Sequence, residues 1–506
     1  MPRLIRLVRR AWALRHDREA LLDGLDRAGL RIVPGAGRYE NRSPRVGGLV
    51  NDAWAGHLTR SLEGLEHLAA GSGREARDAT LALADWDITH HEPGRAVERL
   101  VAMRRLPRDG RTLRAEAERL VGPPPTEPFA DLNRRLDRAG LSTLQSANGT
   151  FTSLHAMSPE PVDGPLVTVI VPAFNAADTI ANTLTSLVAQ SWRNLEIIVV
   201  DDASTDQTAT VVESIHDQRI TFLRQPINLG AYAARNRGLA AASGDYVTVN
   251  DADDWAHPAK IATQVQHLVA TTHSVATASS LVRITHDLRV VRRGLPHGHF
   301  VGRNYASLMM HTERLRSLGG WDHVRVGADS ELEARLTHLY GPRVITRLHE
   351  DAPLTLALSD ASSLTGSSST GLASSRVSTG ARRLYTLAST HWHQSLSLDQ
   401  PQLQRTSDFE PFPVPNLIRQ PTSSTEPLDV IIWSDLALPG GTTASNLAEV
   451  AANEQAGWRT GLVHNRNPKY RDIGVNPKFF DACSDHTRLL SAGEEVSCDV
   501  LVIKYP

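Results

Sequence analysis

Three carboxylates lie within four residues at the end of an apolar run in the middle of the chain. Asp251, Asp253 and Asp254 fall at the end of GDYVTVNDADDW, residues 244–255. Carboxylates this close repel one another unless a cation neutralises them, and their hard oxygens suit Mg²⁺ or Mn²⁺. In an extended segment Asp251 and Asp253 would share one face. The motif therefore predicts a metal–diphosphate site and group transfer from an activated donor.

Two earlier apolar runs end at polar residues in the same way, and they indicate the sheet that would carry the acids. These runs are VTVIVPAFN at residues 167–175 and LEIIVVDDASTD at residues 195–206. Buried parallel strands are apolar throughout, and their carboxyl ends meet at a crevice where ligands bind. Strand and helix patterns alternate from residue 165 to 358, which predicts an α/β domain with a mainly parallel sheet. Helices are expected at residues 178–190, 205–216, 230–242 and 258–271.

The regions on either side of this domain have different patterns. Residues 1–155 read as a helical domain, with helical spacing of apolar residues at 76–87 and 94–105 and small residues that favour close packing of the tetratricopeptide type. Residues 359–427 read as a Ser/Thr-rich linker and a helical extension. From residue 428 to 506, strands, a Gly-Gly turn and a helix indicate a Rossmann-like unit. That unit is incomplete, which suggests that the chain is part of a longer protein.

The totals of the chain exclude several classes of protein. Its 506 residues are enough for about three domains, and a net charge of -2 gives no field for nucleic acid. The two cysteines, Cys483 and Cys498, exclude a disulfide framework and fit a reducing cytoplasm. No apolar run reaches the ~18 residues of a membrane-spanning helix.

The N-terminal stretch, MPRLIRLVRRAWALR, is basic throughout. It would form a helix that either lies on an anionic membrane surface or packs on the following domain. A cytoplasmic location is therefore expected, at the inner face of the membrane if the first alternative holds.

Five motifs in order give the chain a family resemblance. They are VIVPAFNA at 169–176, IIVVDDASTD at 197–206, NLGAYAARNRGL at 228–239, NDADDW at 250–255 and the segment 307–336. In this order and spacing they resemble the family 2 glycosyltransferases, which have the GT-A fold. The resemblance implies inverting transfer of a sugar from a nucleotide-diphosphate donor, a UDP-sugar foremost, to a glycan or lipid-linked acceptor, with Mn²⁺ or Mg²⁺. The unit from residue 428 is similar to the opening of a GT-B-type domain.

The same resemblance implies where the donor binds. The donor-binding positions of the family correspond to Pro172, Ala173, Phe174, Asn175, Asp202, Arg235, Asp251 and Ala252. The end of the first strand would hold the nucleobase and ribose, and Asp202 would accept a hydrogen bond from a nucleobase N–H group. Arg235 would pair with Asp202 or meet a phosphate. Asp253 would bind the metal directly, Asp251 would touch ribose or metal, and Asp254 would cap the next helix.

Four further candidates lie in or after the last motif. The resemblance implies a general base that takes the acceptor proton, and Asp329 is the first candidate, with Glu331 as the alternative. Trp321 would stack on the acceptor sugar or belong to the core. His349 would complete the metal shell or have a structural role.

Two other functions fit part of the same pattern. A nucleotidyltransferase shares the α/β plan and an acid-bound metal, but it usually has a Gly-rich loop with Lys or Arg after the first strand, and PAFNAADTI at 172–180 is not such a loop. A non-catalytic nucleotide-binding scaffold in a polysaccharide-assembly complex would keep the fold without the chemistry. The intact set of acids disfavours the scaffold.

Overall fold

The computed structural model describes residues 58–89, 92–103, 114, 117–118, 121–122, 129–271, 273–291, 301–359, 380–396, 411–419, 427–437, 439–464, 474–491 and 494–504. The chain divides into two compact units, one of residues 1–90, 364–395 and 409–506 and the other of residues 91–363 and 396–408. The basic N-terminal helix and nearly all of the Ser/Thr-rich segment, predictions that rest on residues 1–15 and 360–379, lie outside the described residues.

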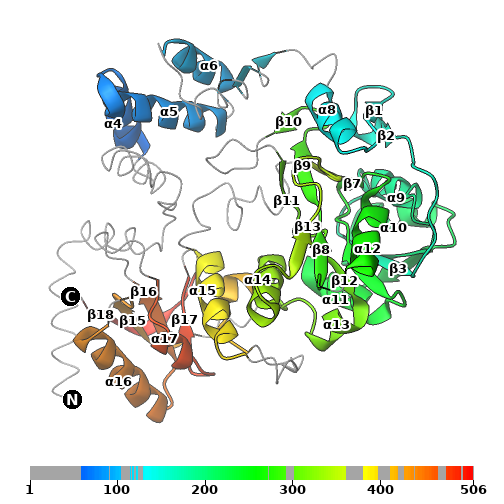
Figure 1. Ribbon diagram of the computed structural model, residues 1–506. Coiled ribbons are helices and arrows are strands. Elements are labelled where there is room, and N and C mark those ends of the chain that lie inside the picture. Colours follow the sequence, from blue (N-terminus) through cyan, green and yellow to red (C-terminus); the bar gives the residue numbers. More distant parts are fainter. Residues whose placement is uncertain are drawn as a thin grey trace, which may run out of the picture. The chain divides into compact units, whose positions relative to one another are not determined.

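A seven-stranded sheet is the centre of the unit that spans residues 91–363 (Figure 1). Its order is β13 (Ile345–Arg347), β8 (Ala276–Ala278), β12 (Met309–His311), β6 (Tyr246–Val249), β3 (Val167–Ala173), β4 (Leu195–Asp201) and β5 (Ile220–Arg224). β12 runs antiparallel to both of its neighbours, and the other pairings are parallel. The predicted α/β domain with a mainly parallel sheet is confirmed.

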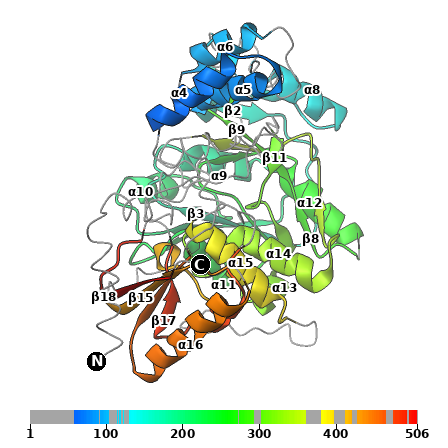
Figure 2. The same cartoon turned by 90° about the vertical axis from the view of Figure 1, so that its left-hand side faces the viewer.

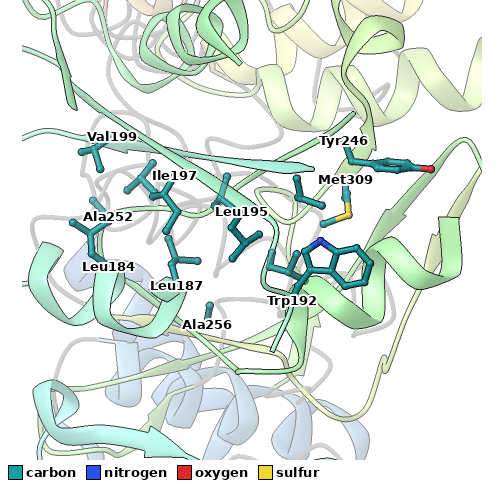
Figure 3. Close-up of a cluster of buried hydrophobic side chains, with 14 of the residues drawn as sticks. Leu184, Leu187, Trp192, Leu195, Ile197, Val199, Tyr246, Ala252, Ala256 and Met309 are labelled. Carbon is teal, nitrogen blue, oxygen red and sulfur yellow. The ribbon is translucent and has the colours of Figure 1, made fainter. Parts of the chain in front are cut away.

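Helices cover both faces of β3, which is why every residue of this strand is buried. On one face Val167, Val169 and Val171 join a core with α9 (Ile180–Val188) and α12 (Lys260–Ala270). Figure 3 shows part of this core, with α9 side chains beside those of β4. On the other face lies α11 (Ala231–Ala241), where a Cβ on Gly238 would come within 2.5 Å of Ile170 Cγ2. A small residue is therefore required at this close approach.

A second sheet adjoins the acidic motif. It consists of β10 (Val290–Val291), β9 (Ser280–Ile284), β14 (Thr355–Leu358) and β7 (Asp254–Ala256), with β11 (Val301–Arg303) also paired to β9. Its apolar side chains share a core with α8 (Ala130–Arg138) and with the hairpin of β1 (Leu144–Ser146) and β2 (Leu154–Ala156). The sequence pattern had placed residues 144–156 in a helical domain. They instead form a β-hairpin that shares a core with β7.

The remaining described helices before residue 103 agree with the helical pattern. α4 (Leu58–Ala69) and α5 (Gly73–Thr89) pack through Leu65, Ala79, Ala82 and Leu83, and small side chains let such helices approach closely. α6 (Pro93–Val101) begins with proline, as a first helical turn allows. Within the described residues, every helix is too short or too polar to cross a lipid bilayer.

The C-terminal strands form a separate parallel sheet in the order β17 (Thr487–Leu489), β16 (Thr460–His464), β15 (Leu428–Ser434) and β18 (Cys498–Lys504). Numbered along the chain this order is 3-2-1-4, the start of a doubly wound sheet. α16 (Gly441–Gln455) follows β15, and Gly440 at its N-cap has a φ of 120°. α15 (Ala381–His393) belongs to the same unit as these strands (Figure 2). His391 Nε2 lies 2.7 Å from Asp481 Oδ1.

Candidate active site

A buried arginine on α11 brings several predicted residues together. Arg235 is 4% exposed, and its Nη2 donates to Asp251 Oδ1 at 2.7 Å. Burial opposes its charge, but Asp251, Tyr232 and Asp329 outweigh burial and raise the pKa of Arg235. The guanidinium carbon lies 5.9 Å from the ring centroid of Trp321. The structure therefore groups Arg235, Asp251, Asp329 and Trp321.

The arginine still has donors to offer. Among the described residues, Nε and Nη1 of Arg235 are buried without a hydrogen-bond partner. A buried N–H group with no acceptor is costly, and the cost is larger for a charged group. The predicted ion pair of Arg235 with Asp202 is not observed, because Arg235 pairs with Asp251. Anionic oxygens would satisfy these two donors, Nε and Nη1, which point in different directions from the guanidinium.

The loops after β3 and β4 are fastened to each other. The backbone N–H of Asp202 donates to the carbonyl of Ala173, and the backbone N–H of Asn175 donates to Ser204 Oγ. Asn175, with a φ of 48°, accepts from the backbone N–H of Thr205. Pro172 and Ala173 are buried in the strand, whereas Phe174 is 49% exposed. Of this predicted group, Phe174 therefore presents an aromatic face to solvent.

Asp202 fixes the loop that leads into α11. Its carboxylate accepts from Gln225 Nε2 at 2.6 Å and from the backbone N–H groups of Leu229 and Gly230 at 2.8 and 2.6 Å. Burial raises the pKa of Asp202 in spite of these donors and the charge of Arg325. Both carboxylate oxygens of Asp202 thus already have hydrogen-bond partners within the protein. A nucleobase N–H group would have to donate to a lone pair that these partners leave free.

A cavity of about 410 Å³ lies beside this loop and is lined by Ala203, Arg224, Gln225, Pro226 and Arg237. Gln225 connects it to the site, because the same side chain binds Asp202. Arg237, two residues after Arg235 on α11, adds a second positive charge to its lining.

The acidic motif is a turn and not an extended segment. The backbone N–H of Asp254 donates to the carbonyl of Asp251 at 3.1 Å. The side chain of Ala252 joins the core of Figure 3, while Asp251 and Asp253 are partly exposed. The prediction that Ala252 contacts the donor is thus wrong for its side chain, although Asp251 and Asp253 do point away from the core.

Asp254 does not cap a helix, as the sequence had suggested. It is a buried residue of β7, and α12 begins after an N-cap at Ala259. Burial raises its pKa well above the ordinary value, and the charges of Asp253 and Asp251 add to the rise. Burial also lowers the pKa of Lys260 to about 8, against the pull of Asp254 and Asp251. The acids therefore create a negative potential that the protein relieves only in part.

This potential suits a divalent cation at Asp251 and Asp253, with its other ligands from outside the protein. Among the described residues there is no group of three or more His, Cys, Asp or Glu side chains placed to hold a metal ion. His349, half-buried with a φ of 51°, therefore does not complete a three-residue set with the two aspartates. The prediction of His349 as a third metal ligand is therefore corrected. Its backbone carbonyl accepts a hydrogen bond from Ser280 Oγ.

The two candidate bases are separated by their surroundings. Both lie in the first turn of α14 (Ala328–Tyr340), which follows Gly327 at a φ of 98°. Asp329 is partly exposed, accepts from the backbone N–H of Ser330, and acts electrostatically on Arg235. Glu331 is buried in an ion pair with Arg335, whose Nε lies 3.1 Å away. Asp329 is accessible in this structure, whereas Glu331 is held in the buried ion pair, which favours Asp329 as the base.

Trp321 forms a wall of the site. It is 4% exposed, its backbone N–H donates to Asn236 Oδ1, and its carbonyl accepts from Asn236 Nδ2. A Cβ on Gly320, whose φ is 67°, would collide with that same oxygen of Asn236. Arg335 donates to the carbonyls of Leu318 and Gly320. The side chain of Trp321 is therefore oriented by the protein before any sugar binds.

Comparisons with known proteins show which families part of the chain is similar to. Residues 168–330 match Glycosyl transferase family 2. An Escherichia coli UDP-Glc:alpha-D-GlcNAc-diphosphoundecaprenol beta-1,3-glucosyltransferase, WfaP, is 39% identical over 103 residues, which are 20% of this chain and 41% of that protein. The putative glycosyltransferase EpsE of Bacillus subtilis is 30% identical over 178 residues, 32% of this chain and 62% of that protein.

Among solved structures, S. aureus TarS 1-349 in complex with UDP aligns with a TM-score of 0.32 and 21% identity, over 39% of this chain and 61% of that one. The chain thus spans between about two fifths and two thirds of the length of each of these matches.

Proposed function

We propose, from the premise that residues 168–330 form a family 2 glycosyltransferase domain, that the protein transfers a sugar from a nucleotide-diphosphate donor to a hydroxyl group with inversion. The observation that carries this proposal is Arg235, a buried cation between Asp251 and Asp329 with two N–H groups that lack an acceptor. A diphosphate supplies the anionic oxygens that such donors need. The same arginine stands between the donor-side and acceptor-side acids.

The donor would lie across the carboxyl ends of β3, β4 and β6. Phe174 offers an exposed ring to the nucleobase end, and Asp202 holds the loop beside it. Asp251 and Asp253 would hold a Mn²⁺ or Mg²⁺ ion together with the diphosphate. When bound, the ion stabilises negative charge on the departing nucleotide.

Asp329 takes the proton of the acceptor hydroxyl, whose oxygen then forms the new bond to the anomeric carbon as the bond to the diphosphate breaks. Attack from the face opposite the leaving group inverts the configuration. A partly exposed carboxylate near a buried guanidinium can accept a proton and then release it to water. Trp321 limits the positions that the acceptor can take, because its backbone is fixed by Asn236.

The relatives support a choice of substrates to test. A UDP-sugar is the first donor and a glycan or lipid-linked sugar the first acceptor, because WfaP is named for UDP-Glc and a diphosphoundecaprenol-linked sugar. The product would be a surface polysaccharide. Two unpaired cysteines agree with the cytoplasmic location that this proposal includes, with membrane contact through the basic N-terminus.

A thermal-shift series with UDP, GDP and their sugars, with and without Mn²⁺, tests the proposal. One nucleotide series should raise the Tm in a Mn²⁺-dependent manner, because a ligand at 100 times its Kd stabilises the fold by about 2.7 kcal/mol. Asp253→Asn should lose the Mn²⁺-dependent part. Asp217→Asn, which removes a carboxylate bound to Arg219 on another loop, should keep it. A folded protein with no shift for any nucleotide would refute the proposal.

A further inference from the structure

A lysine with no exposed surface lies under the acidic turn. Lys260 is the first residue of α12, and its Nζ donates to Asn250 Oδ1 at 2.7 Å. Burying an ammonium is expensive, and the lowest-cost partner would be a carboxylate in direct contact. Asp254 and Asp251 act on the ammonium through their charge, but the hydrogen-bonded partner is the neutral amide of Asn250. This hydrogen bond therefore needs a reason besides charge neutralisation.

The amide of Asn250 supplies that reason. Its Nδ2 donates to the carbonyls of Asp251 and Asp254, at 3.2 and 3.1 Å, and so spans the two ends of the turn. An ammonium can only donate, so Lys260 fixes which end of the amide points away from the turn. Reversal of the amide would bring its NH₂ group against Lys260 and its oxygen against two carbonyls. Lys260 thus keeps both donors of Asn250 directed at the turn.

We propose that Asn250 and Lys260 are positioning residues, which hold the backbone of the acidic turn so that Asp251 and Asp253 present their carboxylates to one cation. The inference rests on the proposed function of the same site. Neither side chain touches donor or metal, and both act through the backbone that carries Asp251 and Asp253. Residues that orient metal ligands from behind typically change metal affinity by about 10–100-fold when they are replaced.

α12 also contains a matched control one turn further on. Gln264 is as fully buried as Lys260, and its Nε2 donates to the carbonyl of Ser307 at 2.6 Å. Its contacts lie with β8 and the segment before β12 and not with the acidic turn. Replacement of Gln264 should disturb the core to a similar degree and leave the turn in place.

The experiment measures Mn²⁺ binding to the full chain at saturating UDP, by the loss of the free Mn²⁺ signal in electron paramagnetic resonance. Lys260→Met frees the amide of Asn250, and Asn250→Asp keeps an acceptor for Lys260 but removes both bonds to the turn. Each variant should raise the Kd for Mn²⁺ by about tenfold or more. The Kd of Gln264→Leu for Mn²⁺ should stay within about twofold of the wild-type value, even if its Tm falls as far as that of the other two variants.

The outcomes separate the inference from the function on which it rests. Wild-type protein that binds no Mn²⁺ with UDP would refute the proposed metal–diphosphate site itself. Wild-type protein that binds Mn²⁺, with both variants folded and within twofold of it, would overturn the positioning role alone. A rise in Kd that Gln264→Leu shares would also overturn it, because the effect would then come from the core.

Discussion

The donor side and the acceptor side of the site use the same parts with different charge balance. Each has a turn held by an asparagine and a buried cation. These are Asn250 and Lys260 at the acidic turn, and Asn236 and Arg335 at the turn of Gly319 and Gly320. Arg335, however, has its own carboxylate, because Glu331 lies one turn away on the same helix with both side chains 1% exposed. Lys260 binds a neutral amide instead.

This difference indicates what each side is built to do. On the acceptor side the buried cation Arg335 has a carboxylate partner, Glu331, and donates to the carbonyls of Leu318 and Gly320. At the donor side burial and the neighbouring acids raise the pKa of Asp254, and Arg235 keeps two N–H groups without acceptors in the described structure. Damage to the acceptor-side framework should therefore reduce stability, and damage to the donor-side framework should reduce ligand affinity. The predictions below test this contrast.

The largest effect is expected at Asp329. Asp329→Asn removes the general base, so the rate of sugar transfer should fall by about 10²–10⁴-fold. The Kd for the donor nucleotide should change little, because the hydrogen-bonded ion pair that holds Arg235 is with Asp251 and remains in this variant. Initial rates of transfer and nucleotide titrations measure the two quantities, with Ser330→Ala as the neighbouring control. Undiminished transfer would place the base elsewhere.

Glu331, two residues along the same helix, should give the opposite result. Glu331→Gln leaves Arg335 charged and buried without its carboxylate, which should cost about 3–5 kcal/mol of unfolding free energy. Urea unfolding measures the loss. Glu313→Gln, at a surface pair with a side chain 82% exposed, should change stability little. A stable Glu331→Gln variant that has lost transfer would mean that Glu331 acts in the chemistry after all.

A smaller loss of stability is expected at Gly320. An alanine there must adopt a φ of 67° and displace Asn236 Oδ1, and left-handed backbone alone costs about 1–3 kcal/mol at a non-glycine residue. Gly140 provides the control, because its φ is 71° and a Cβ there would meet nothing within 4 Å. Gly320→Ala should lower the free energy of unfolding by more than Gly140→Ala. Equal losses would show that the contact with Asn236 does not matter.

The strands of the main sheet could be predicted well from the sequence, but the loops and short elements around them could not. The run predicted at residues 167–175 is continuous and apolar, and its ends fall within two residues of the limits of β3. The run predicted at residues 195–206 begins where β4 begins, although β4 ends earlier, at Asp201. α10 (Thr208–Glu213) begins later than predicted, because the preceding polar residues bind the loop after β3 and Asp206 accepts from the N–H of Thr208. The β1–β2 hairpin was missed because strands of three residues have too little alternation to recognise.

The candidate site shows the same limit. Asp251, Asp329 and Arg235 were predicted from their motifs, and the structure brings them together. Lys260, Asn250 and Arg335 were not predicted to hold the turns. A lysine or arginine in a helical pattern looks the same in sequence whether it is exposed or buried. Burial also favours Asp329 over Glu331, a choice that spacing alone left open.

The smallest expected effect is a pH dependence on the donor side, at His257. Its Nε2 lies 2.9 Å from the carbonyl of Ser142, and its Nδ1 accepts from the backbone N–H of Ala259, so the neutral ring fits the site. Burial lowers the pKa of His257 below 6.5, and the charge of His349 adds to this. The unfolded chain therefore binds the proton more readily, and the stabilisation present above pH ~6.5 should be lost as the pH falls through the folded pKa.

Urea unfolding at pH 7.5 and 5.5 tests this expectation. Wild-type stability should fall by more on acidification than that of His257→Gln, while His216→Gln, at an exposed loop position, should behave like the wild type. Asp254 acts in the opposite sense, because its raised pKa favours the folded state in acid. His349, whose pKa burial also lowers, acts in the same sense as His257. Both are present in every variant, so only the difference between variants reports His257, and identical differences would contradict a buried neutral ring.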